Sequence, residues 1–295
     1  MKVTVLGSGG FGYPLVFCGC ENCNKARIFG GKNIRKRASI LINDEMLIDL
    51  TPDSCVAMGM YGKDMSKVKY LIQTHTHLDH FDTNHFITLD SKYAVIKDEK
   101  LNLICSDLCL NDIQYKISQY EKMNLFDAEY LNKINLQVST INHGESLVIG
   151  DYLIKAIHCT HHENIGAQIY LITHNSKTLL YATDTTMITD IALEELKGFK
   201  IDCVFLDESF GLNDYMAKHL NIKGFKEYIL QLKNNNLMAD NCRIFATHIT
   251  HDGNPLHDEL EEILAKDGAS ASYDGMEIEI WLTNWEYNNT VLFKI

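Results

Sequence analysis

The sequence has few of the features that divide a chain into separate domains. Only three of its 295 residues are proline (Pro14, Pro52 and Pro255), and it contains no low-complexity segment and no clear internal repeat. Proline-rich or low-complexity linkers are typical of multidomain chains. We therefore expect residues 1–295 to form one domain. At this length, with 46% hydrophobic residues, the chain can bury a large core without disulfides.

Long apolar runs and an excess of positive charge are also absent. No run approaches the ~20 residues that a membrane-spanning helix needs. The start, Met1 and Lys2 followed by VTVLGSGG, reads as a first strand rather than a secretory signal, so we expect a cytoplasmic protein without membrane contact. A net charge of −12 argues against a nucleic-acid polymer as partner. A small anionic substrate stays compatible, because a bound metal supplies local positive charge.

Short apolar runs rich in β-branched residues recur along the chain, and each has about the length of a strand. They are KVTVLG, ASILIN, MLIDL, YLIQT, LNLICS, YLIKAIH, QIYLIT, TLLYAT, CVFLD, RIFAT, MEIEIWL and TVLFKI. Helical spacing of apolar residues is found at 107–123, 190–197, 222–233 and 257–265. Strands dominate early and helices alternate with strands later, which indicates a layered α/β sandwich.

Nine cysteines in a scattered set fit a reducing compartment rather than a disulfide framework. Six of them lie singly, mostly among apolar residues, and are expected to fill the core. The other three, Cys18, Cys20 and Cys23, lie within FCGCENC (17–23). This spacing fits part of a metal clip, a redox pair with a spectator, or a reactive loop. A tetrahedral metal would need a fourth ligand, and the neighbouring sequence does not offer one.

The densest group of metal-ligand residues follows the apolar run at 70–73. In THTHLDH (74–80), four such side chains occur within six residues: His75, His77, Asp79 and His80. In an extended chain His75 and His77 lie on the same side, and the following turn can bring Asp79 and His80 to a second position. Imidazole and carboxylate ligands suit Zn²⁺, Mn²⁺ or Fe²⁺.

Further candidates come at the ends of other predicted strands. Asp184 follows TLLYAT, His248 follows RIFAT, and AIHCTHH contributes three histidines. We expect Asp184 and His248 to be ligands, because α/β folds build metal sites where strand ends converge. His219, in MAKHLN, is either a site residue or a solvated surface residue. The sequence around the remaining histidines at 85, 143, 174 and 257 does not distinguish them from structural or exposed residues.

Together these motifs resemble the metallo-β-lactamase fold, a four-layer αββα sandwich of the α/β class. More narrowly, they resemble the cyclic phosphodiesterases of the phosphonate-degradation (carbon–phosphorus lyase) pathway. The matching stretches are GSGG, the cysteine triplet, IRKRASILI before LIDL, THTHLDH, LLYATDT, THITH and YDGMEI. The His-x-His-x-Asp-His signature alone is typical of the whole superfamily. The cysteine triplet with THITH and DGMEI is far more specific.

The resemblance implies three metal positions. The first active-site metal would be bound by His75, His77 and one histidine of the 158–162 group, and the second by Asp79, His80 and His248, with Asp184 bridging the two. Counting from IGD (149–151) selects His161 and counting back from Tyr170 fits His162 better; we choose His161. A structural Zn²⁺ would be held by Cys18, Cys20, Cys23 and His251, a closed Cys₃His set, in an N-terminal loop at about residues 17–24.

The function that the resemblance implies is a metal-dependent hydrolase, and most specifically a phosphodiesterase on a small cyclic phosphodiester or nucleotide-like substrate. Two divalent ions, Zn²⁺ or Mn²⁺ with Fe²⁺ as an alternative, would generate a bridging hydroxide near neutral pH and neutralise the substrate. His219 matches a family histidine that contacts phosphate or acts as general acid, and Asp79 could also orient the water. The basic run KNIRKR (32–37) is expected to be a solvated loop, with phosphate contact as the alternative.

Other reactions on the same fold are the alternatives. The cysteine triplet also resembles the pyrroloquinoline quinone biosynthesis B protein, which is associated with oxidative chemistry. Lactonases and thioesterases share the His-x-His-x-Asp-His pattern but are not expected to carry the Cys₃His clip. His77 argues against diiron flavoproteins, which have glutamate there, and the full ligand set argues against a non-enzymatic scaffold. The oligomeric state stays open, with a homodimer among the expected forms.

Overall fold

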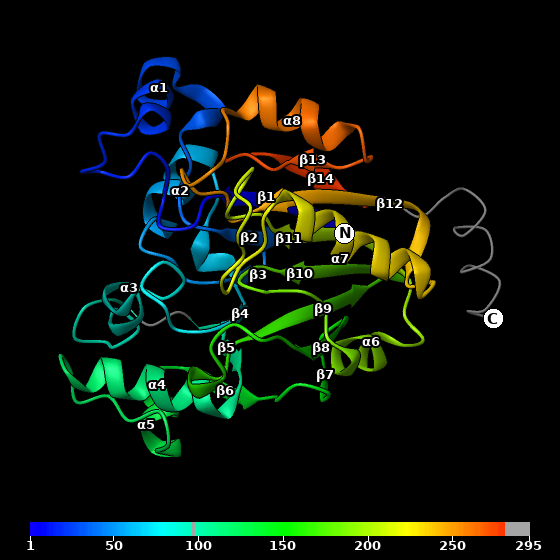
Figure 1. Ribbon diagram of the computed structural model, residues 1–295. Helices are drawn as coiled ribbons and strands as arrows, with labels where there is room; N and C mark the ends of the chain where they lie inside the picture. Colours follow the sequence, from blue (N-terminus) through cyan, green and yellow to red (C-terminus); the bar gives the residue numbers. More distant parts are fainter. Residues whose placement is uncertain (96–97, 281–295) are drawn as a thin grey trace.

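The computed structural model describes residues 1–95 and 98–280. Two seven-stranded sheets pack face to face, and helices cover the outer face of each sheet (Figure 1). The predicted four-layer αββα sandwich is confirmed. Among the described residues, no helix combines the length and the apolar character that crossing a bilayer requires.

The first sheet has the strand order β14-β1-β2-β3-β4-β5-β6. Its strands are β1 (Lys2–Gly7), β2 (Ser39–Ile42), β3 (Met46–Ile48), β4 (Tyr70–Ile72), β5 (Leu101–Cys105), β6 (Leu136–Thr140) and β14 (Glu277–Glu279). The strands from β14 to β3 are antiparallel to their neighbours, and those from β3 to β6 run parallel. Val3 pairs with Ile42 on one side and with Ile278 on the other, so β14 adds a late segment of the chain to the first strand.

The second sheet has the order β13-β12-β11-β10-β9-β8-β7. Its strands are β7 (Ser146–Ile149), β8 (Tyr152–His158), β9 (Gln168–His174), β10 (Lys177–Ala182), β11 (Ile201–Asp207), β12 (Met238–Thr247) and β13 (Ser270–Ala271). Strands β7 to β10 form an antiparallel meander, and β10 to β13 are parallel. The parallel halves of the two sheets are the parts in which neighbouring strands end at the same edge.

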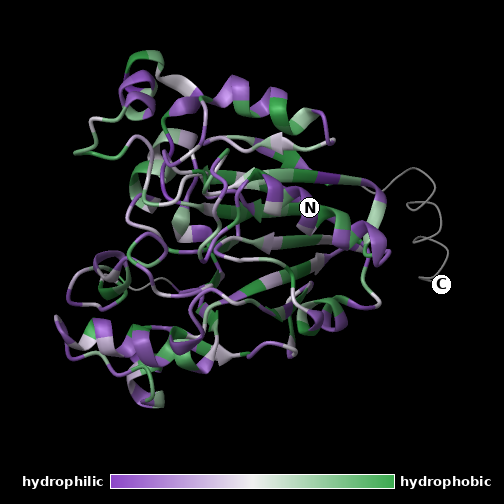
Figure 2. Ribbon diagram, in the orientation of Figure 1, coloured by the Kyte–Doolittle hydropathy of each residue, from purple (hydrophilic) through white to green (hydrophobic). Residues whose placement is uncertain are grey.

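Helices fill the two outer layers. They are α1 (Glu21–Phe29), α2 (Ser54–Tyr61), α3 (Thr83–Ile87), α4 (Asp107–Ser118), α5 (Ala128–Lys133), α6 (Asp190–Leu196), α7 (Ile222–Asn234) and α8 (His257–Ala265). The four helices predicted from spacing correspond to α4, α6, α7 and α8. Helix α4 ends five residues earlier than the prediction, after Ser118. The outer helices α4, α7 and α8 alternate hydrophobic and hydrophilic residues, whereas the central strands are mostly hydrophobic (Figure 2).

The core follows from alternation along the strands. In β4, Leu71 faces the helices outside the first sheet, while Ile72 faces the second sheet; Leu103 and Ile104 do the same in β5. Both faces of these strands are therefore buried, which explains their continuous apolar runs. Each fully buried Leu or Ile side chain contributes about 1.5–3 kcal/mol through its removal from water.

Most predicted strands are confirmed, with two qualifications. MEIEIWL forms β14 only at Glu277–Glu279, and its last two residues, like all of TVLFKI, lie outside the described residues. The sequence patterns missed β6, β7, β13 and the helices α1, α2, α3 and α5. Helix α2 illustrates why: its sequence SCVAMGMY carries apolar residues on several sides and buries only Ser54 and Ala57, so it lacks a single apolar face.

Candidate metal centre

The candidate site lies where strands of both sheets end at one edge. Asp49 follows β3, the THTHLDH segment follows β4, Asp184 follows β10, and His248 follows β12. Three of these residues have a left-handed backbone, with φ of 65° at Asp49, 52° at Asp184 and 59° at His248. Such a conformation is uncommon outside glycine and clusters at functional sites. The abrupt turns aim these side chains back across the strand ends.

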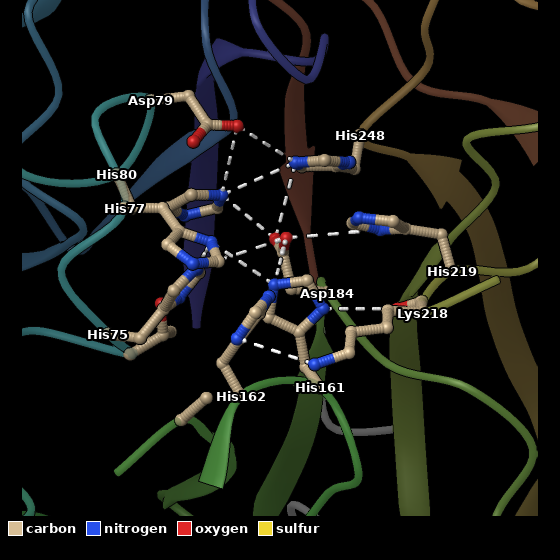
Figure 3. Close-up of polar contacts among 12 residues, drawn as sticks. His75, His77, Asp79, His80, His161, His162, Asp184, Lys218, His219 and His248 are labelled. Atoms are coloured by element: carbon tan, nitrogen blue, oxygen red, sulfur yellow. Dashed lines mark hydrogen bonds and ion pairs between the residues drawn. The ribbon is translucent and has the colours of Figure 1, made fainter. Parts of the chain in front are cut away.

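Two groups of ligand side chains meet at this edge, and Asp184 lies between them (Figure 3). The first group contains His75, His77, His161 and Asp184; the second contains Asp79, His80 and His248. Asp184 Oδ1 is 3.3 Å from His161 Nε2, and Asp184 Oδ2 is 2.8 Å from His80 Nε2 and 3.2 Å from His248 Nε2. One carboxylate therefore contacts both groups with different oxygens.

Contacts on the outer side of the imidazole rings set which nitrogen faces the centre. His80 Nδ1 donates to Asp49 Oδ2 across 2.8 Å, and His161 Nδ1 donates to the Lys218 carbonyl across 3.0 Å. His161 Nε2 then lies 3.2 Å from His77 Nδ1. In a neutral imidazole whose Nδ1 carries the proton, Nε2 offers only a lone pair. Oriented in this way, histidines are ready to bind a metal.

The outer nitrogen of His248 is also held by a hydrogen bond, in this case to a serine. Its Nδ1 is 2.8 Å from Ser209 Oγ, and Ser209 donates its own proton to Asp207 Oδ1. On the inner side, His248 Nε2 and His80 Nε2 are 3.3 Å apart. Asp184 Oδ2 is buried without a hydrogen-bond partner, although His80 Nε2 lies only 2.8 Å away. Close approach without hydrogen-bond alignment is what two ligands of one cation show, so these residues fit a metal.

Burial and charge set the protonation of the cluster. Burial lowers the pKa of His161 to about 4 and holds the pKa of His75 well below its ordinary value. Burial would also lower the pKa of His80, but the carboxylates of Asp184, Asp79 and Asp49 outweigh it and hold that pKa well above the usual range. A metal bound at the second group would therefore displace a proton from His80.

Between the two adjacent candidates, the structure places His161 in the first group. His161 is buried within the ligand cluster, whereas His162 is half-buried and packs its ring 4.5 Å from that of His77. His158 points elsewhere, because its Nδ1 contacts Thr189 Oγ1 at 3.0 Å. Metal binding by His161 stays a prediction, but His161 lies where a ligand of the first group has to lie.

His219 lies at the edge of the second group. Its Nδ1 is 2.8 Å from Asp207 Oδ2 and 3.8 Å from Asp184 Oδ1, and its ring stacks on His248 with centroids 5.1 Å apart. Burial lowers its pKa, but the Asp207 carboxylate more than offsets this and raises the pKa of His219 to about 9. His219, Asp184 and His248 also form a group that could hold a cation. A solvated surface position is excluded by these contacts.

The three clustered cysteines and His251 form a separate group. His251 Nδ1 is 3.5 Å from Cys18 Sγ and 3.4 Å from Cys20 Sγ, and Cys23 completes the set. Asn22 fixes the histidine segment by donating to the carbonyls of His251 and Asn254. All four potential ligands converge, which is the arrangement that a tetrahedral Cys₃His zinc site needs. Burial raises the pKa of the Cys23 thiol to about 12, so a cation would be required to hold it as thiolate.

The sequence of the chain matches one known family over most of its length. A sequence model of the family described as "Beta-lactamase superfamily domain" matches residues 46–249. The chain belongs to the β-lactamase superfamily. The family membership expected from the motifs is thereby confirmed. Among curated proteins, none matches the chain at a significant level.

Solved structures show that this superfamily member has the metallo-β-lactamase fold throughout. A diphosphatase from the PhnP family superposes with a TM-score of 0.71 at 22% identity, over 95% of this chain and 98% of that chain. Zn²⁺-bound PqqB from Methylobacterium extorquens superposes with a TM-score of 0.70 at 16% identity, over 95% of this chain and 100% of that chain. The short form of human tRNase Z superposes with a TM-score of 0.60 at 13% identity, over 96% of this chain and 100% of that chain. At these identities the likeness establishes the fold.

Sequence reasoning missed the carboxylates that support the ligands of this β-lactamase superfamily site. Asp49 accepts from His80 Nδ1, from the Thr74 backbone N–H and from Gln73 Nε2. Asp207 accepts from His219 Nδ1 and from the Asp184 backbone N–H. Both aspartates end an apolar run, in LIDL and CVFLD, as Asp184 does in LLYATD. That signal was available in the sequence.

The expected solvated loop at 32–37 is wrong for its arginines and for Lys36. Arg35 is buried and donates to Ser8 Oγ and to the Ser272 carbonyl. Lys36 pairs with Asp274, and Arg37 pairs with Asp53. The contacts of Arg35 and Lys36 join this run to the segment at 272–274, and the Arg37 pair is partly exposed. The positive charge of residues 32–37 did not by itself show that part of this segment is buried and paired within the protein.

Proposed function

We propose that this chain is a metal-dependent phosphodiesterase that uses two divalent cations to cleave a small cyclic phosphodiester or nucleotide-like substrate. The observation that carries the proposal is the position of Asp184, with Oδ1 3.3 Å from His161 Nε2 and Oδ2 2.8 Å from His80 Nε2. Cations held by the two groups would neutralise the anionic diester and supply an activated water. Zn²⁺, Mn²⁺ and Fe²⁺ all suit these ligands.

The residues of the chain would orient the reacting groups and provide a proton. Asp207 holds Nδ1 of His219 across 2.8 Å and raises its pKa to about 9, so the imidazole is protonated near neutral pH. His219 is the expected general acid for the leaving alkoxide, which needs a proton as the phosphorus–oxygen bond breaks. Asp79 lies 3.4 Å from His248 Nε2 and serves as the carboxylate of the second group.

The names of some structurally similar proteins favour a phosphoester substrate over the alternatives. A diphosphatase and a tRNase share this fold and support the proposal by their names, while the likeness itself establishes only the fold. The Cys₃His group is proposed to hold a structural zinc outside the reaction. We further propose that the substrate is small rather than a nucleic-acid polymer, and the homodimer remains a prediction for size-exclusion chromatography with light scattering.

The test combines metal content with hydrolysis on one sample. Protein purified without added metal would be analysed by mass spectrometry for Zn, Mn and Fe, and assayed with bis(p-nitrophenyl) phosphate before and after addition of Mn²⁺. About three metals per chain, or one tight zinc with activity restored by Mn²⁺, is the expected result. Full occupancy of both groups without hydrolysis would contradict the phosphodiesterase and favour another reaction on the same centre.

The role of His219 has its own test, based on the leaving group. p-Nitrophenolate is a good leaving group and departs without being protonated, whereas an alkoxide needs a proton in order to leave. The variant His219→Gln should therefore lose about 100-fold in kcat on an alkyl phosphodiester and much less on bis(p-nitrophenyl) phosphate. Equal losses on both substrates, together with a lower metal content, would identify His219 as a ligand instead.

A further inference from the structure

One short segment carries a candidate ligand of each metal centre. His248 of the second ligand group and His251 of the Cys₃His group are three positions apart on the segment 248–254, which follows β12. Their side chains point to different centres: His248 Nε2 lies 3.2 Å from Asp184 Oδ2, and His251 Nδ1 lies 3.4 Å from Cys20 Sγ. A displacement at one end of this segment is therefore expected to reach the other end.

Hydrogen bonds connect the same segment to the residue that orients His248. Asn254 is buried, and its Nδ2 donates to the Ser209 carbonyl across 3.0 Å. Thr250 Oγ1 donates to the same carbonyl across 2.6 Å. The Ser209 hydroxyl in turn lies 2.8 Å from His248 Nδ1. Because a partner on the outer nitrogen sets the orientation of a metal-binding histidine, the position of the Ser209 main chain sets where His248 Nε2 points.

The two segments are also packed tightly against each other. Gly211 and Gly253 both have a left-handed backbone, with φ of 50° and 77°. A Cβ added at Gly253 would overlap with the Phe210 carbonyl oxygen, and one added at Gly211 would overlap with the Gly253 carbonyl oxygen. Since close-packed segments transmit strain, the main chain at 208–211 is expected to follow any shift of residues 251–254.

Asn22 joins the other side of this segment to the Cys₃His clip. Its Nδ2 donates to the Asn254 carbonyl across 2.8 Å and to the His251 carbonyl across 3.3 Å. Asn22 lies in the first turn of α1, whose N-terminal cap is the clip residue Cys20. The position of Asn254 therefore depends on where the clip holds the start of α1.

The loop that carries the clip has little core of its own. In the described part of the chain its apolar cluster contains three buried residues, Tyr13, Cys23 and Ala26. Val16 is 83% exposed and Phe17 is fully exposed, so neither anchors the loop. A cation bound by the Cys₃His set would supply the missing restraint, because metal binding at such sites contributes directly to folding.

We propose that Asn254 is a positioning residue that links the Cys₃His clip to His248, so that an occupied clip strengthens metal binding at the second ligand group. This inference rests on the proposed function, to which it adds a form of regulation: the zinc supply to the clip would set how firmly the second cation is held. The two centres keep separate ligands, and only their affinities are coupled.

The test is a double-mutant cycle read by metal affinity. Mn²⁺ would be titrated by calorimetry into protein stripped of its active-site metals, with clip zinc counted by mass spectrometry and His248→Ala as the reference that lacks the second position. Cys20→Ser and Asn254→Ala should each weaken Mn²⁺ binding at that position about tenfold, a typical effect of losing the support of a metal ligand. The double variant should bind about as weakly as the weaker single variant, because both changes interrupt the same connection.

Two further measurements separate positioning from a loss of stability. Asn254→Ala should keep about one zinc per chain in the clip, and it should shift the visible absorption of Co²⁺ bound at the second position, which reports ligand geometry. Asn22→Ala removes a half-buried side chain outside the centre and should weaken Mn²⁺ binding in the same way. It replaces Asn254→Ala in the cycle if that variant does not fold.

The matched controls are Asn102→Ala and Cys55→Ser. Asn102 Nδ2 also donates to two main-chain carbonyls, those of Lys69 and Lys100, but it lies at the end of β5 that is remote from the centre. Cys55 is an exposed thiol in α2. Both variants should leave the Mn²⁺ affinity and the Co²⁺ absorption unchanged.

Three outcomes would overturn the proposal. They are an unchanged Mn²⁺ affinity in Cys20→Ser after loss of the clip zinc, strictly additive losses in the double variant, and equal losses at both Mn²⁺ positions, which would indicate general destabilisation. Because calorimetry needs no turnover, these outcomes are distinct from a failure to hydrolyse phosphodiesters.

Discussion

Asp49 accepts a hydrogen bond from His80 across 2.8 Å, with both side chains fully buried. The other contacts of this carboxylate are donors too, from Thr74 and Gln73. A residue that sequence reasoning passed over thus orients a candidate ligand of the second metal. Such a partner on the outer nitrogen is what fixes the ring orientation of a metal-binding histidine.

Asp49→Asn would place an amide N–H₂ where the carboxylate now accepts hydrogen bonds from the Thr74 N–H, the Gln73 amide and His80. We expect a loss of about 2–4 kcal/mol in the free energy of unfolding and weaker metal binding at the second group, measured by urea denaturation and metal titration. Asp44→Asn is the control, because Asp44 is half exposed and pairs only with Lys63 in the described contacts. A variant at Asp49 as stable as the control would contradict this role.

His248→Ala and Cys20→Ser should separate the two kinds of metal site. The first removes a ligand of the second group and should abolish hydrolysis while about one zinc per chain remains. The second removes a thiolate of the clip, so it should lose that zinc and lower the melting temperature. Metal content by mass spectrometry decides the matter. The same metal loss in both variants would contradict two independent sites.

Gly10 is a close neighbour of His248, and adding a methyl group there should disturb the ligand. A Cβ at this position would lie 2.9 Å from Thr250 Cγ2 and 3.0 Å from His248 Cε1. Gly10→Ala should therefore lower the affinity of the second metal about tenfold or more, as expected for displaced ligand support, with hydrolysis falling in parallel. Metal titration followed by assay would measure this.

The control for that variant is Gly59→Ala in α2, where an added Cβ meets nothing within 4 Å. It should raise stability by about 0.5–1 kcal/mol, because alanine favours a helix over glycine, and leave metal binding unchanged. Full metal affinity in Gly10→Ala would show that the loop adjusts without moving His248.

The carboxyl group of Glu208 should make the stability of the folded protein depend on pH. It is fully buried, and burial holds its pKa well above the usual value, with Asp207 adding to the shift. An acid with a raised folded pKa stabilises the protein below its unfolded pKa, near 4.3. That contribution is lost as the pH rises through the folded pKa.

Glu208→Gln removes this charge with little change of shape. The difference in melting temperature between variant and wild type should be near zero at about pH 4–5 and grow to several degrees towards pH 8, with the variant more stable. Exposed Glu227→Gln should show no such trend. A gain that is constant across this pH range would mean that Glu208 is not neutralised by burial.

Much of the fold was predictable because both sheets are covered on both faces. Runs such as YLIQT and TLLYAT are apolar throughout, and a run of that length fits a buried strand. Helices with one clear apolar stripe, such as α7, were found for the same reason. Helix α2 and the short strand β13 were not, because pairing and packing with distant residues rather than local pattern stabilise them.

The site divides in the same way. The sequence by itself supplied the candidate ligand types, since histidine and aspartate at the ends of apolar runs already predict a metal at a sheet edge, and the cysteine triplet predicts a clip through its resemblance to a known family. Only the tertiary structure placed His161 within the buried ligand cluster, paired Asp49 with His80, and buried Arg35. The physical reason is that ligand chemistry is a local property of side chains, whereas hydrogen-bond partners and burial are set by residues tens to hundreds of positions away.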